Sequence, residues 1–144
     1  MKRLHVGVVV EDVEASLRFY KDLFGAEPRF LGNGYARWML DDPLVNFVIS
    51  RRGDAPGVGH LGIQVENPAE LVEITDRMKA AGHKLLEQSG STCGYAIQNK
   101  AWASDPQGVF WEAFQTLALK QDDYGLDDFE DAEFAALFDE ARQA

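Results

Sequence analysis

The pattern of apolar and polar positions divides the chain into short elements. A valine-rich apolar run over residues 4–10 is typical of a buried or half-buried strand. Apolar side chains then recur at helical spacing over residues 13–24, where Asp12 would cap the start of a helix and Gly25 its end. Three short strands are predicted next, separated by groups rich in Gly, Asn, Asp and Pro, at about residues 27–32, 35–40 and 44–51.

The second half of the chain shows the same order of elements. A strand is predicted to start at His60, after a linker over residues 53–59. Pro68 is well suited to the first turn of a helix that runs to about Ala81, with Gly82 at its end. Strands are predicted to complete this half at about residues 84–88, 94–103 and 109–116. Both halves therefore read as β-α-β-β-β modules.

The two halves also share short motifs in the same order. His5-Val6-Gly7 begins the first strand of one half, and His60-Leu61-Gly62 begins the first strand of the other. Other features that recur are a Tyr-Ala pair and an Asp-Pro pair, at Tyr35-Ala36, Asp42-Pro43, Tyr95-Ala96 and Asp105-Pro106. Shared features in one order indicate an internal duplication. The predicted fold class is α+β, with two paired β-α-β-β-β modules.

We expect a single domain over residues 1–120, with modules at about residues 3–52 and 58–117. A free module of about 50–60 residues buries too little surface to be more than marginally stable. The modules should therefore pack together, curve into a shared cup and bury their Val, Phe and Trp side chains in one core.

An acidic C-terminal extension over residues 121–144 has no counterpart in the first module. It holds nine acidic side chains and one basic side chain, and so carries most of the formal net charge of −10. Apolar residues on one face predict a helix from about Asp127 to Ala141. This helix would dock on the protein's own sheet, or it would present a surface to a second subunit or another protein.

Composition excludes several classes of partner. The chain lacks the basic patch that binding to nucleic acid or to an anionic membrane requires. No run approaches the roughly 20 apolar residues of a membrane span. The single cysteine, Cys93, excludes an intrachain disulfide and fits a reducing compartment. We therefore expect a cytoplasmic protein, a monomer or a homodimer, that acts on a small-molecule substrate.

Two histidines at equivalent strand positions suggest a metal site. Neutral imidazole is the commonest metal ligand, and two such strands packed side by side can converge on one ion. His5 or His60 alone would more often be an ordinary, partly buried histidine. The third histidine, His83, follows a helix-ending glycine and is expected in an exposed loop.

Glu112 is the candidate third ligand. It lies in a strongly apolar strand beside Phe110, Trp111 and Phe114. Burial of a carboxylate there costs several kcal/mol unless it is paired or binds a cation, and the alternative is a side chain that points to solvent. Two His and one carboxylate match the facial triad of non-haem iron oxygenases. An incomplete protein shell leaves room for water, oxygen or substrate, which favours catalysis over a structural role.

These features resemble the vicinal oxygen chelate superfamily, which includes glyoxalase I, bleomycin-resistance proteins and extradiol dioxygenases. Within it, the chain is similar to cadmium-induced proteins and organoarsenical carbon–arsenic lyases over about residues 1–116. The motifs that carry the similarity include Leu4-His5-Val6, Phe24-Gly25-Ala26-Glu27-Pro28, His60-Leu61-Gly62-Ile63-Gln64-Val65-Glu66 and Trp111-Glu112.

The resemblance implies a set of metal ligands. In the lyases, ferrous iron is held at positions that correspond to His5, His60 and Glu112. One divalent ion is therefore expected here, with Fe(II) first and Zn, Ni or Mn as alternatives. The favoured function is a metal-dependent enzyme of lyase or dioxygenase type.

The resemblance also implies a substrate site around Cys93. The lyases capture a trivalent organoarsenical with two adjacent cysteines before an oxygen-dependent cleavage of the carbon–arsenic bond. Cys93 matches the first cysteine, as a catalytic and substrate-binding residue, but Gly94 replaces the second, so chelation of arsenic is lost. Tyr95 and Lys100 are further substrate-binding candidates, and we expect Cys93 and Lys100 on a mobile loop over about residues 87–100.

Other interpretations of these residues stay open. An inert, partly buried Cys93 is one, because free cysteine often behaves as a small hydrophobic residue. A non-catalytic protein that sequesters a drug-like small molecule or a soft metal ion, as bleomycin-resistance proteins do with their ligand, is the alternative function. A duplicated scaffold with a decayed site is a third reading. The His-His-Glu set favours the enzyme, because a sequestering cup has no need of it.

Overall fold

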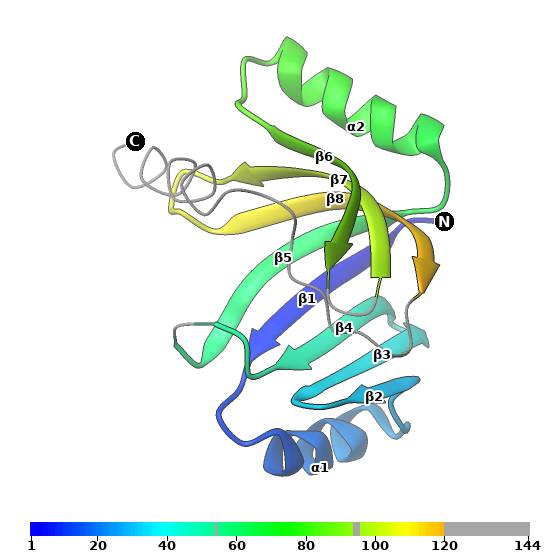
Figure 1. The fold of residues 1–144 in the computed structure, drawn as a ribbon, viewed down its shortest axis with the longest axis vertical. Coiled ribbons are helices and arrows are strands. Elements are labelled where there is room, and N and C mark those ends of the chain that lie inside the picture. Colours follow the sequence, from blue (N-terminus) through cyan, green and yellow to red (C-terminus); the bar gives the residue numbers. More distant parts are fainter. Residues whose placement is uncertain (54, 94–95, 120–144) are drawn as a thin grey trace. The chain divides into compact units, whose positions relative to one another are not determined.

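The computed structural model describes residues 1–53, 55–93 and 96–119, and Figure 1 shows them as a ribbon. The chain divides into two compact units: one is Arg3–Leu61, and the other is Met1–Lys2 together with the chain from Gly62 onward. The acidic helix that the sequence predicts lies outside the described residues. In the described part, no helix is long and apolar enough to cross a membrane.

The unit Arg3–Leu61 contains the first β-α-β-β-β module. Its elements are β1 (Arg3–Val9), α1 (Val13–Phe24), β2 (Phe30–Gly32), β3 (Tyr35–Asp41) and β4 (Leu44–Ser50). The strands lie in the order β2-β3-β4-β1, with antiparallel pairing from β2 to β4 and parallel pairing between β4 and β1. A parallel pair needs a long crossover connection, and the chain from α1 to β3 supplies it.

The core of this unit is aromatic. Trp38 and Ile49 are fully buried, and α1 packs Tyr20 and Phe24 against them. The ring centroids of Tyr20 and Phe47 are 4.6 Å apart, and those of Phe24 and Phe47 are 5.1 Å apart. Aromatic rings bury large apolar areas and gain a further contribution from edge contacts of this kind. The helix is therefore held on the sheet by its apolar stripe.

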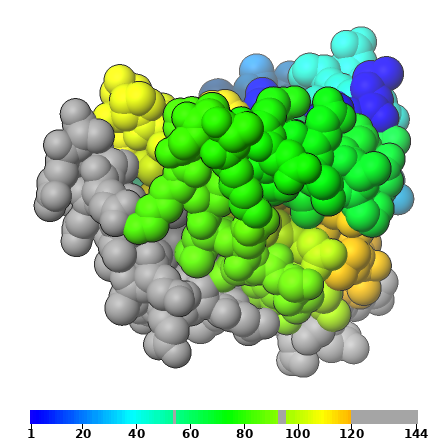
Figure 2. Space-filling model, turned by 90° about the horizontal axis from the view of Figure 1, so that it is seen from above, coloured from blue at the N-terminus to red at the C-terminus, as the bar shows by residue number. Residues whose placement is uncertain are grey.

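The other unit contains most of the second module. β5 (Gly57–Val65) runs from one unit into the other, and the chain continues with α2 (Pro68–Ala80), β6 (Leu86–Cys93), β7 (Ala96–Ser104) and β8 (Phe110–Leu119). β7 pairs antiparallel with both β6 and β8. The apolar side chains of α2 pack against Val65 and Ala113. Figure 2 shows the residues of α2 in green as space-filling atoms.

α1 begins after the cap that the sequence predicts, Asp12, and α2 begins at Pro68, which the sequence places in the first turn. The side chain of Asp12 accepts a hydrogen bond from the Ala15 amide, and that of Asn67 accepts one from the Glu70 amide. α1 ends at Gly25, whose φ of 61° is the left-handed conformation that glycine adopts at little cost. These caps satisfy amides and carbonyls that helix ends leave unpaired.

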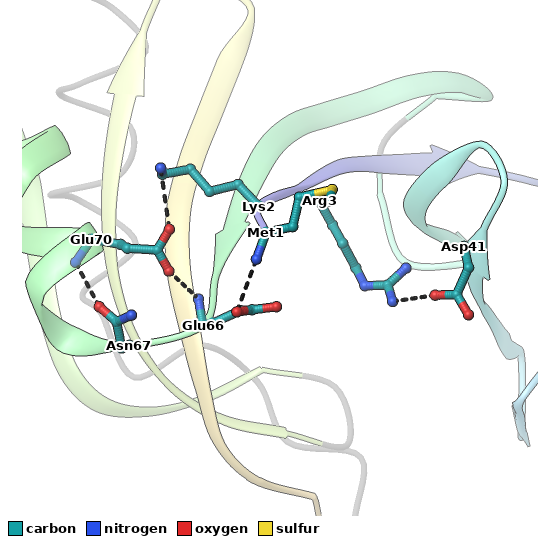
Figure 3. Close-up of polar contacts among 7 residues, drawn as sticks. All are labelled: Met1, Lys2, Arg3, Asp41, Glu66, Asn67 and Glu70. Carbon is teal, nitrogen blue, oxygen red and sulfur yellow. Dashed lines mark hydrogen bonds and ion pairs between the residues drawn. The ribbon is translucent and has the colours of Figure 1, made fainter.

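Short polar contacts hold the N-terminal residues to the start of α2 (Figure 3). The amino group of Met1 lies 2.9 Å from a carboxylate oxygen of Glu66, and Lys2 Nζ lies 3.1 Å from Glu70 Oε2. The Glu66 amide also donates to Glu70 Oε1 over 3.1 Å. This main-chain hydrogen bond, followed by the contact with Lys2, lowers the pKa of Glu70.

The fold class predicted from the sequence is confirmed: the protein is α+β, with two β-α-β-β-β modules. One expectation is wrong. Residues 87–100 were expected to form a mobile loop, but β6 and β7 pair there, with a register irregularity between Gln88 and Ser91. Small polar residues favour turns locally, but main-chain pairing with β7 overrides that preference. Lys100 accordingly lies on β7 and not on a loop.

Candidate metal centre

The two histidines at equivalent strand positions meet through their ring nitrogens. His5 lies on β1 with 5% of its surface exposed, and His60 lies half-buried on β5. Their Nε2 atoms are 2.9 Å apart, and the ring centroids are 4.9 Å apart. The structure thus brings the two histidines together, and their binding of an ion stays a prediction.

The main chain of β4 fixes the orientation of His5. The parallel register places His5 opposite Asn46, and His5 Nδ1 lies 3.0 Å from the Asn46 carbonyl oxygen. A carbonyl only accepts, so Nδ1 carries the hydrogen and donates it. In the neutral imidazole, the lone pair is then on Nε2, which is the atom directed at His60. A hydrogen bond from the outer nitrogen to a carbonyl is the usual way to orient a metal-binding histidine.

Gly7 makes the space for the second histidine. A Cβ atom on Gly7 would lie 2.5 Å from His60 Cε1 and 2.8 Å from His60 Nδ1, far inside van der Waals contact. Only glycine at this position lets the imidazole of His60 lie over β1 in the orientation that brings it to His5. The His-x-Gly motif thus has a physical reason in the first module, which the sequence pattern alone did not give.

The spacing of the two Nε2 atoms fits a shared divalent ion. Bonds of about 2.0–2.1 Å from an ion to imidazole nitrogens, meeting at a right angle, place the nitrogens about 2.9 Å apart. The measured separation is 2.9 Å. Adjacent positions at a right angle are those that a facial set of ligands occupies in octahedral coordination. The donor set and its spacing therefore fit such an ion.

Glu112 is buried in the other unit, where it pairs with Lys100. The side chain of Glu112 is 3% exposed and that of Lys100 is 0% exposed, and Lys100 Nζ lies 3.2 Å from Glu112 Oε2. The alternative that Glu112 points to solvent is therefore wrong. The ammonium group also lies 5.4 Å from the centre of the Trp102 ring. A charged pair this deep is expensive to desolvate, so each member depends strongly on the other.

Sequence reasoning missed this pairing, although a signal for it exists. Lys100 alternates with Gln98 and Trp102 along β7, and all three are buried. The register places Trp102 opposite Glu112, so Lys100 is a diagonal neighbour of the carboxylate on the same face. The two-residue period of β7 was readable in the sequence, but the register that brings Lys100 to Glu112 was not.

The remaining site residues lie at the edge of the described structure. Cys93 ends β6, where its main chain pairs with Ala96. The side chain of Cys93 and all of Gly94 and Tyr95 lie outside the described residues, so their part in the site stays a prediction. His83 lies exposed between α2 and β6, as expected.

Comparison with known proteins identifies relatives of the chain. The family model of the Glyoxalase/Bleomycin resistance protein/Dioxygenase superfamily matches residues 2–113. A trivalent organoarsenical cleaving enzyme of Bacillus sp. (strain MD1) is 42% identical over 119 residues, which are 81% of this chain and 74% of that protein. The cadmium-induced protein CadI of Mycobacterium bovis is 34% identical over 122 residues, 82% of this chain and 78% of that protein.

Among solved structures, the fold is similar to that of a Mn(II)-bound glyoxalase from Novosphingobium aromaticivorans. The TM-score is 0.60 at 19% identity, over 88% of this chain and 44% of that chain. At this identity the likeness concerns the fold alone. Together with the sequence relatives, these matches agree with a superfamily of metal-dependent lyase and dioxygenase type. The chain belongs to the Glyoxalase/Bleomycin resistance protein/Dioxygenase superfamily.

Proposed function

We propose that this protein is a metal-dependent enzyme of lyase or dioxygenase type that binds one divalent ion through His5, His60 and Glu112. The observation that carries the proposal is the pair of Nε2 atoms 2.9 Å apart, with His5 held by the Asn46 carbonyl. Two neutral imidazoles at this distance gain at most one hydrogen bond from each other. They gain two coordinate bonds from a shared ion.

The chemistry of the donor set supports ferrous iron as the ion. Two imidazoles and one carboxylate form the facial set of non-haem iron enzymes, and zinc, nickel and manganese are the alternatives. The ion would supply a Lewis-acidic, oxygen-reactive centre with coordination positions open to substrate. Neighbouring residues would hold these ligands in place. The Asn46 carbonyl would orient His5, and Lys100 would contact the carboxylate of Glu112.

A trivalent organoarsenical is the proposed substrate class. Relatives with 42% and 36% identity are named as a trivalent organoarsenical cleaving enzyme and a probable one. Cys93 would supply a thiolate, which is a soft ligand suited to arsenic, with Tyr95 and Lys100 as further substrate contacts. Gly94 stands where the resemblance implies a second cysteine. Capture by a single thiolate would therefore be weaker than in the lyases.

The substitution at Gly94 also supports the alternative function, a protein that binds a small molecule or a soft ion without turnover. A single thiol would hold arsenic less tightly, but it would not change the paired histidines His5 and His60. The two functions differ in oxygen consumption. An enzyme consumes oxygen as it cleaves the substrate, whereas a sequestering protein binds the same ligand and consumes none.

The test is aerobic cleavage of a trivalent aryl arsenical by the iron-loaded protein, measured as released arsenite and as oxygen uptake. The proposal expects turnover in the wild type, its loss in His60→Ala, and its retention in His83→Ala, the matched control on an exposed histidine. Gly94→Cys should strengthen arsenical binding at least tenfold, or about 1.4 kcal/mol. Binding with neither cleavage nor oxygen uptake in the wild type and in Gly94→Cys would favour sequestration.

A further inference from the structure

The buried ion pair of Lys100 and Glu112 contains a positive charge that a set of metal ligands does not require. A carboxylate ligand can be oriented by a neutral hydrogen-bond donor, as second-sphere partners commonly do. Here the partner is a full cation whose side chain is 0% exposed, 3.2 Å from Glu112 Oε2. Burying an ammonium group is among the costliest placements available to a side chain. A role for the charge itself would account for its retention.

In the metal-free protein, the two charges compensate each other. Lys100 and Glu112 together carry no net charge, and the face of the Trp102 ring, 5.4 Å from Nζ, stabilises the ammonium further without neutralising it. Lys100 is thus the built-in counter-cation of Glu112, and it lets the carboxylate stay ionised and buried before a metal arrives.

Binding of a divalent ion to Glu112 changes this balance. The single negative charge is then shared between a dication and the ammonium group, and the three groups hold two positive charges in excess. Two neutral histidines do not alter the total. Excess positive charge in a water-poor interior attracts an anion strongly, because the local dielectric screens little. Lys100 is the protein group that carries part of this excess.

We propose that Lys100 turns the metal-loaded site into a receptor for an anionic ligand. The ligand class is an ionised oxygen or sulfur group of a substrate, or a small inorganic anion, which binds to the ion and to the Lys100 ammonium together. Lys100 also opposes metal binding, because its charge repels the dication and competes for Glu112. Anion binding therefore depends on the metal. This inference rests on the proposed metal function.

Opposite effects of one substitution on two ligands distinguish this role from a structural one. Lys100→Met removes the cation but keeps an apolar stem of similar length. With the competitor and the repulsion gone, the metal should bind more tightly. With the second contact gone, an anion should bind the loaded site more weakly. A lysine that only supports the fold would, when lost, weaken both ligands together or change neither.

The experiment uses Co²⁺ as the metal and azide as the anion, since the visible absorption of Co²⁺ reports both binding events. Metal affinity is measured by competition with a chelator, and azide affinity by titration of the loaded protein. The matched control is Lys79→Met. Lys79 is a half-exposed lysine of the same unit, 2.8 Å from Glu87, and its loss removes an ion pair outside the site.

The expected result is that Lys100→Met binds Co²⁺ at least tenfold more tightly and azide at least tenfold more weakly, whereas Lys79→Met matches the wild type in both. Lys100→Gln, which keeps a donor for Glu112 without the charge, should show the same signs and serves if Lys100→Met does not fold. Unchanged azide affinity in a loaded, folded variant would overturn the inference and leave the metal function intact. A wild type that fails to bind Co²⁺ would overturn the metal function as well.

Discussion

The strands β4 and β8 end the two repeats, but they bury different side chains. β4 buries Val45, Phe47 and Ile49, and at Asn46 it contributes a main-chain carbonyl to His5. β8 buries the carboxylate of Glu112. Each module has a histidine on its first strand, whereas a carboxylate occurs on the last strand of the second module only. The two modules thus share the order of their elements, and the proposed metal ligand Glu112 lies where their last strands differ.

The same contrast extends to the strands next to them. β3 presents Trp38 to an aromatic core, with its Nε1 bonded to the Ala26 carbonyl. β7 also buries a tryptophan, Trp102, but beside it β7 buries Gln98 and Lys100. The first module is thus stabilised mainly by apolar packing, and the second also contains a buried charged pair. The two modules should respond differently to substitution.

The largest effect is expected in the aromatic core. Trp38→Ala leaves a large cavity under α1 and removes a hydrogen bond, so it should lower the free energy of unfolding by about 3–5 kcal/mol. Chemical denaturation of the metal-free protein measures this loss. A loss below about 1 kcal/mol would show that the core of the first module does not depend on its apolar packing.

A comparable loss of stability is expected in the second module, and a second substitution should recover it. Lys100→Met alone leaves Glu112 buried without its cation and should cost about 3–5 kcal/mol in the metal-free protein. The double variant Lys100→Met/Glu112→Leu removes both charges and should recover most of that loss, because apolar replacements of a buried pair are often neutral. If the double variant is no more stable than the single one, charge compensation is not the reason for the pair.

A smaller effect on stability, with a large effect on the site, is expected at Gly7. A Cβ there would lie 2.5 Å from His60 Cε1, so Gly7→Ala must displace the imidazole. Overpacking of this kind costs about 1–3 kcal/mol. Affinity for a divalent ion should fall at least tenfold, as measured by chelator competition. Gly25→Ala is the contrasting variant, since a Cβ there meets nothing within 4 Å and its cost comes from a φ of 61° alone; its metal affinity should stay at the wild-type value.

The smallest effect concerns pH and lies away from both cores. The pKa of Glu70 is lowered by the Glu66 amide and then by Lys2, so its charged form is favoured in the folded state. This contribution is fully present above the pKa of the unfolded chain and is lost as pH falls through the lowered value. Glu70→Gln should therefore reduce the melting temperature slightly at neutral pH and not at strongly acidic pH. A difference that does not depend on pH would contradict this origin.

The repeat made most of the fold predictable from the sequence. Apolar spacing, the cap at Asp12 and the first-turn residue Pro68 are local signals, and both helices begin where those signals placed them. The same logic placed β6 and β7 less well. Ser91 pairs with Gln98 of β7, whereas Ser89 and Gly90 lie in the register irregularity between Gln88 and Ser91. There the Ser89 hydroxyl and the Gly90 amide donate to Asn99 Oδ1, a side-chain contact that local turn preference does not indicate.

The sequence was sufficient to predict which residues belong to the candidate site. It was not sufficient to predict the contacts that these residues make. A histidine duplicated at His5 and His60 pointed to a pair, and a lone acid in an apolar strand pointed to a buried Glu112. The partner of that acid depends on cross-strand register, which the hairpin between β7 and β8 sets. The role of Gly7 depends on how closely β5 approaches β1. Neither the register of β7 and β8 nor the approach of β5 to β1 is encoded in the local sequence.

The central claim is that the duplicated histidines and the single acid hold one metal ion. Its most direct test is the metal stoichiometry of the purified, Fe(II)-loaded protein after removal of unbound ion. One ion per chain is expected in the wild type and in His83→Ala, with loss of the ion in His5→Ala and His60→Ala and weakened binding in Glu112→Gln. Stoichiometry and affinity equal to the wild type in all three site variants would contradict the claim.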